Sequence, residues 1–200
     1  MEGLSSAGNI QGAPADALIA IFNAKSIPHV LKWVNDFVFF RVPIHALPST
    51  CSPQHIQYSY GIPTILSITG HLSVPWHPIE MKGQDFQSSV TYVGFVWDLD
   101  TRSVSLSDKK RKKYLAKIVN FLYKANDKVT HRECLSIHGM LQHITFVYHE
   151  GCAFLPSLSS FFSRFPNDFV GHHIPKLILE DLCWWQAILA IPCVPHSLTP

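Results

Sequence analysis

The stretch VLKWVNDFVFFR, residues 30–41, has two apolar arms on either side of the polar pair Asn35-Asp36. Each arm is too short for a stable helix and is rich in valine and phenylalanine, which favours β-strands. Pro28 and Pro43 bound the stretch. Asparagine tolerates positive φ, and both polar side chains can bond nearby backbone. The pattern therefore predicts a β-hairpin whose connection is Asn35-Asp36.

The composition predicts a globular chain with one sizeable core or two small ones, because 47% of its 200 residues are hydrophobic and only 15% are charged. The five cysteines form no C-x-x-C pair, which favours neither a disulfide framework nor a zinc ribbon and fits a reducing compartment. No secretory signal or membrane-spanning run is recognisable. We therefore expect an intracellular protein, cytoplasmic or nuclear, that is not secreted and does not enter a membrane.

Positive charge is concentrated in one segment. Between residues 108 and 128 eight lysines and arginines stand against two aspartates, a local charge of +6 within a chain of net charge +2. Such a segment attracts polyanions.

The remaining pattern divides the chain into two halves. A loop of small residues, 3–12, leads into a predicted helix at 13–24, and a second hairpin with a turn around 98–102 ends near Leu106. After Leu106 the apolar spacing becomes helical. Helices are expected from Ser107 as N-cap, from about Thr130 to Tyr148, around Pro156 and at residues 175–189. The fold class is α+β, with predicted domains 1–105 and 106–200.

The order of these features resembles one family. SSAGNIQG before a helix, the WVNDFVFF hairpin, YVGFVWDLDTRSVSL and the basic helix together resemble the reverse transcriptases of eukaryotic retroelements, especially DIRS-like and gypsy-like retrotransposon polymerases. The later GMLQHITFVYHEGCAFLPSLSSFF and EDLCWWQAIL are similar to the thumb and connection of those polyproteins. The resemblance implies a partial polymerase palm, made of hairpins and a helix, followed by an all-helical thumb and connection.

The resemblance also implies a metal site at the first hairpin. In the family two adjacent aspartates at the hairpin tip help to hold the Mg²⁺ ions of an RNA-directed DNA polymerase, because this hard cation prefers anionic oxygen. Asp36 matches the second aspartate, while Asn35 stands at the position of the first and supplies no charge. The third family aspartate lies upstream, where only Glu2 and Asp16 are acidic. We therefore expect this nucleotidyltransferase-like region to be truncated and catalytically inactive alone, with weak Mg²⁺ binding or none.

Other roles follow from the same resemblance, with an RNA/DNA primer–template as the implied partner. The positions that match are Gln11 and Gly12 for nucleotide and template binding, Tyr92, Gly94 and Phe95 for the primer grip, and Lys109, Lys110, Arg111, Lys112, Lys113 and Lys117 for the nucleic-acid backbone.

Plainer interpretations stay open for each motif. The Asn-Asp pair also suits an ordinary turn, and the basic run also suits a solvated helix face or a nuclear-import patch. Without the upstream strand, Phe37, Phe39 and Phe40 would be partly exposed and would favour self-association. The leading hypothesis is a reverse-transcriptase fragment, and the alternative is a non-catalytic basic nucleic-acid-binding or scaffold protein.

Overall fold

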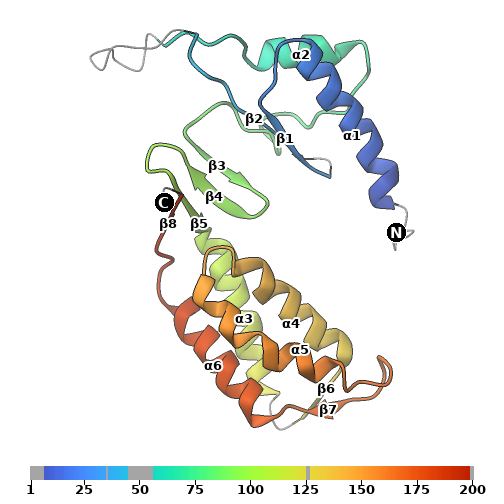
Figure 1. The fold of residues 1–200 in the computed structure, drawn as a ribbon, viewed down its shortest axis with the longest axis vertical. Coiled ribbons are helices and arrows are strands. Elements are labelled where there is room, and N and C mark those ends of the chain that lie inside the picture. The colour runs from blue at the N-terminus through green and yellow to red at the C-terminus, as the bar shows by residue number, and fades with distance from the viewer. Residues whose placement is uncertain (1–6, 35, 45–55, 125–126, 199–200) are drawn as a thin grey trace. The chain divides into compact units, whose positions relative to one another are not determined.

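The computed structural model describes residues 7–34, 36–44, 56–124 and 127–198. Over these residues six α-helices and several small antiparallel sheets form the α+β fold that the sequence predicts (Figure 1). The chain divides into two compact units, residues 1–87 and 88–200. None of the helices in the described ranges is long and apolar enough to cross a membrane.

The first unit contains the predicted hairpin, with β1 (Val30–Trp33) paired to β2 (Asp36–Phe39). Trp33 pairs with Asp36, so Asp36 is the first residue of β2, whereas the sequence predicted it in the connection. Val34 has φ +58°, and Asn35 lies outside the described residues. This register puts Val30 and Phe39 on one face of the hairpin. The packing of that face, and not the turn propensity of Asn-Asp, therefore sets where the turn lies.

Two helices accompany this hairpin, α1 (Ala7–Ala24) and α2 (Ile62–Gly70). The predicted loop before the first helix is wrong, because Gln11 and Gly12 lie inside α1. Small residues and glutamine are compatible with a helix, so a run of them does not by itself predict a loop. The Gly12 carbonyl accepts a hydrogen bond from Lys32 Nζ at 3.0 Å.

The core of the first unit is small. Phe22, on α1, is fully buried and meets the ring of Phe39 edge-on at 5.0 Å. Trp76 covers Phe37 at 5.5 Å. The hairpin phenylalanines are therefore half-buried on this inner face, whereas Trp33 on the other face is 60% exposed.

The second unit begins with an antiparallel sheet of order β3-β4-β5-β8, formed by β3 (Ser89–Tyr92), β4 (Phe95–Asp98), β5 (Ser103–Leu106) and β8 (His196–Ser197). The expected turn at 98–102 is present, and the Asp98 carboxylate accepts the Thr101 backbone N–H at 2.8 Å, which holds the pKa of Asp98 below its usual value. The connection Val93-Gly94 has positive φ at both residues, as a tight hairpin turn requires.

Helices make up the rest of this unit. They are α3 (Asp108–Tyr123), α4 (His131–Ile144), the 3₁₀ helix η2 (His149–Phe154), α5 (Pro156–Phe162) and α6 (Lys176–Ala190), with β6 (Lys128–Val129) paired to β7 (His172–His173). Thr130 caps α4 in a reciprocal capping box with Glu133. Pro156 begins α5 instead of interrupting it, because a first-turn proline loses no helical hydrogen bond.

The boundary between the units differs from the expected one at Leu106. Phe95, Val104 and Leu106 are buried in the same core as Ile118, on α3, and Trp185, on α6. The sheet therefore packs with the helices, and the division falls before it, between residues 87 and 88.

Candidate nucleic-acid interface

The basic run DKKRKKYLAK forms the first turns of α3, and the helical period sorts its cations by face. Lys109, Lys113 and Lys117 repeat every four residues, and Lys110, three residues before Lys113 and seven before Lys117, lies beside them on the side toward α4. We call Lys109, Lys110, Lys113 and Lys117 the lysine face. It is the only part of the predicted backbone-binding set that shares one side of the helix.

Two contacts connect the lysine face to α4. Lys110 Nζ lies 3.4 Å from His143 Nε2, and Lys117 Nζ donates to Ser136 Oγ at 2.7 Å. These contacts define an antiparallel register in which Lys113 lies at the level of Met140, next to Gly139. No neighbouring atom lies within 4 Å of a Cβ added at Gly139, so the helices leave open space there. Together they form a shallow basic surface.

The lysine face lacks counter-charges. Within the described ranges no carboxylate lies within 4.0 Å of any of its four ammonium groups. Burial, followed by the positive charge of Lys113, lowers the pKa of both Lys110 and Lys117. The lysines therefore repel one another, and an anion laid across them would relieve that repulsion.

Arg111 does not belong to this surface, which corrects the expectation that it contacts a nucleic-acid backbone. It is only 6% exposed, and its guanidinium donates to the Leu189 carbonyl at 2.6 Å and to Asp108 Oδ1 at 2.8 Å. It thereby binds the C-terminal carbonyls of α6, where the helix dipole favours a cation. Lys112 is exposed but is paired with Asp108 at 3.2 Å.

The expected primer-grip residues have three different environments. Phe95 is 4% exposed and packs against His143 at 4.6 Å and Phe146 at 5.2 Å, so its ring is not free to contact a ligand. Tyr92 is half-buried, and its carbonyl accepts the Trp97 indole N–H at 3.1 Å. Gly94 lies beside the lysine face.

Gly94 is needed at this position for two reasons. Its φ of +83° disfavours other residues, and a Cβ there would lie 1.6 Å from Lys110 Nζ. The β3–β4 turn, α3 and α4 therefore meet at Lys110. His143, Ser136 and Gly139 were not predicted, although their spacing on one face of α4 is a signal that could have identified them.

Of the two residues of the predicted metal site, only Asp36 belongs to the described part of the chain. Asp36 is the exposed first residue of β2, and its neighbour Asn35 is uncharged. In the described part of the chain no three His, Cys, Asp or Glu side chains form a group that could hold a metal ion. The Asp16 carboxylate is paired with Lys32 at 2.5 Å. This donor set does not fit a two-metal centre.

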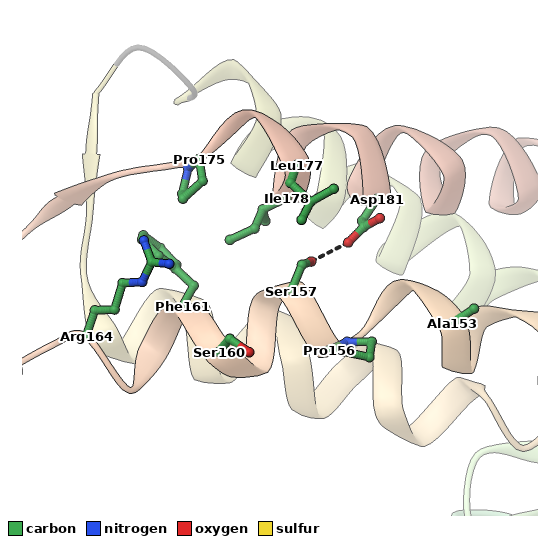
Figure 2. A pocket seen from close by; sticks show the side chains of 10 residues that line it. All are labelled: Ala153, Pro156, Ser157, Ser160, Phe161, Arg164, Pro175, Leu177, Ile178 and Asp181. Carbon is green, nitrogen blue, oxygen red and sulfur yellow. Dashed lines mark hydrogen bonds between the residues drawn. The ribbon is translucent and has the colours of Figure 1, made fainter.

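A pocket of about 390 Å³ lies between α5 and α6 (Figure 2). Its wall is largely apolar and includes Phe161 and Ile178, while Arg164 and Asp181 bring one charge of each sign. The Asp181 carboxylate accepts a hydrogen bond from Ser157 across the two helices. None of the residues that the sequence suggested for a metal or nucleic-acid site lines this pocket.

The chain matches no protein-family model, no curated protein and no solved structure. The residues themselves are therefore the basis for a functional conclusion.

Proposed function

We propose that this chain binds the phosphate backbone of RNA or DNA through the lysine face, and that it is a reverse-transcriptase-derived region that does not polymerise on its own. The observation that carries the binding proposal is the alignment of four lysines on one side of α3 without a neighbouring carboxylate in the described ranges. Phosphate contacts by lysine supply most of the non-specific affinity for nucleic acid.

The dimensions of the lysine face suit a nucleic-acid strand. Seven residues separate Lys110 from Lys117, which is a rise of about 10 Å along α3. Phosphates follow one another about every 3.4 Å of helix axis along one strand of a duplex. Three such steps cover this rise, so the face is long enough for about four successive phosphates of one strand.

The proposed polymerase ancestry rests on the order of the motifs in the sequence. Inactivity is proposed because two-metal phosphoryl transfer requires several carboxylates, and the described residues contain no group of three His, Cys, Asp or Glu side chains that could hold a metal ion. The alternative, a basic nucleic-acid-binding or scaffold protein of other origin, shares the lysine face but makes no use of Asp36.

A salt titration of binding tests the lysine face. Fluorescence anisotropy with a labelled single-stranded oligonucleotide should give a log–log slope of about −3, from four contacts of about −0.7 each. Lys113→Gln should reduce the slope by about 0.7, whereas the matched Lys112→Gln, which removes a lysine already paired with Asp108, should leave it nearly unchanged. Equal effects of the two substitutions would place the interface elsewhere, and absence of binding would refute the function.

A second assay separates the two origins. Tighter binding to a recessed primer–template end than to a blunt duplex of equal length supports the polymerase ancestry, and equal binding supports the alternative. Primer extension with Mg²⁺ and deoxynucleotides should give no product with the unmodified chain. Asn35→Asp should also give none, because it restores only one carboxylate. Robust synthesis by the unmodified chain would overturn the proposed inactivity.

A further inference from the structure

His143 is the most unusual neighbour of the lysine face. Its half-buried imidazole lies between the Lys110 ammonium, 3.4 Å from Nε2, and the ring of Phe95 at 4.6 Å. On the β3–β4 side the ring lies beside the backbone of Val93, which partly offsets the lowering of the His143 pKa. Two basic side chains thus face each other directly, at one end of a surface without counter-charges.

The contacts fix the protonation state of the free protein. A lysine ammonium has only donors, so Nε2 accepts from the charged Lys110, and the proton of the neutral ring then resides on Nδ1. A second ring proton would point at the ammonium. Burial and the charge of Lys110 accordingly lower the pKa of His143, and the ring is neutral near pH 7.

The groups around the pair favour a change of state when an anion arrives. From α3 the charged neighbours are Lys110 and, one turn on, Lys113, while the Tyr114 ring lies 5.8 Å from Lys110 Nζ. The β3–β4 turn supplies a carbonyl, and α4 supplies no charged side chain to the pair. In the described ranges neither side chain bonds a carboxylate. A phosphate beside Lys110 would be the first negative charge next to Nε2, and a negative charge favours the imidazolium.

We propose that a backbone phosphate bound at Lys110 is held jointly by Lys110 and a protonated His143, so that nucleic-acid binding takes up one proton. In this exchange the Lys110–Nε2 hydrogen bond breaks, Nε2 gains a proton from water, and both cations donate to phosphate oxygens. The inference rests on the proposed function, because it requires nucleic acid on the lysine face. The affinity for nucleic acid should therefore rise as the pH falls, because His143 on α4 is protonated more readily.

Binding of labelled oligothymidylate tests the linkage, because thymine does not titrate in the range used. Measured at constant ionic strength, affinity should rise about three- to tenfold between about pH 7.5 and about pH 5.5. His143→Gln should lose most of that rise. His138→Gln is the matched control, since His138 is also a half-buried histidine of α4 but bonds Ser159 Oγ at 2.7 Å, and it should keep the rise.

A direct reading of the ring makes the result independent of how well the variants fold. NMR titration of the unmodified chain should show the pKa of His143 increasing when the oligonucleotide is bound. An unchanged pKa, or the same pH dependence in the unmodified chain and His143→Gln, would overturn this inference while leaving the lysine face intact. Absence of binding at both pH values would overturn the proposed function and this inference together.

Discussion

Arg111→Met tests which cations of the basic run stabilise the fold and which bind nucleic acid. The substitution keeps an unbranched apolar stem of similar helix propensity but removes the guanidinium. In the native chain that group donates to the carbonyls of Leu189 at 2.6 Å and Ala190 at 3.4 Å, and to the Asp108 carboxylate.

The expected loss follows from these partners. The Leu189 carbonyl is in a buried contact, and leaving it without a donor costs about 1–3 kcal/mol. Removing the cation from the C-terminus of α6 costs about 0.3–1 kcal/mol more. The Asp108 carboxylate is exposed and regains water, so it adds nothing to the sum. The free energy of unfolding should fall by about 1–4 kcal/mol.

Urea denaturation followed by far-UV circular dichroism measures this loss, and Lys113→Met is the matched control. The control should change stability by less than about 0.5 kcal/mol, because Lys113 is exposed and unpaired with any described carboxylate, but it should weaken oligonucleotide binding. Arg111→Met should lower stability but leave oligonucleotide binding unchanged under conditions in which the variant is folded. A stability change below about 0.5 kcal/mol for Arg111→Met would refute the assignment of this arginine to the fold.

Three further outcomes follow from the second unit. Gly151→Ala should destabilise the unit by about 1–3 kcal/mol or prevent folding, because a Cβ there would lie 2.1 Å from a fully buried tryptophan ring. Gly139→Ala should stabilise the unit by about 0.5–1 kcal/mol, because it replaces a mid-helix glycine where there is open space. Thermal melts compare the two variants. Because the pKa of His143 is lowered in the folded state, folding is favoured when the ring is neutral. This contribution to the free energy of unfolding is complete above the ordinary pKa of histidine and is lost as the pH falls below it. Denaturation series between about pH 5 and about pH 7 should show the loss, and His143→Gln should reduce it. Burial raises the pKa of Cys134 to about 11, so maleimide labelling at neutral pH should modify the exposed Cys152 rapidly and Cys134 only after denaturation.

Local patterns in the sequence determined much of the secondary structure. The apolar arms around Asn35-Asp36 predict the first hairpin, the Asp98 turn ends β4, and Thr130 with Glu133 begins α4, because each signal acts within a few residues. The predicted start of α1 was wrong because no strong local signal marks it. A run of small residues has no strong local preference, so the helix extends through Gln11 and Gly12.

Only the tertiary structure decided what the basic run does. The helical period shows that five consecutive cations cannot share a face, but it does not say which face turns toward the core. Arg111 binds a carbonyl 78 residues away and Lys110 meets a histidine 33 residues away, and no local pattern encodes such distances. The burial of Phe95 and Leu106 among the helices likewise set the boundary between the units. The sequence placed the charges along the chain, and the packing of distant segments determined which of them meet solvent and which stabilise the fold.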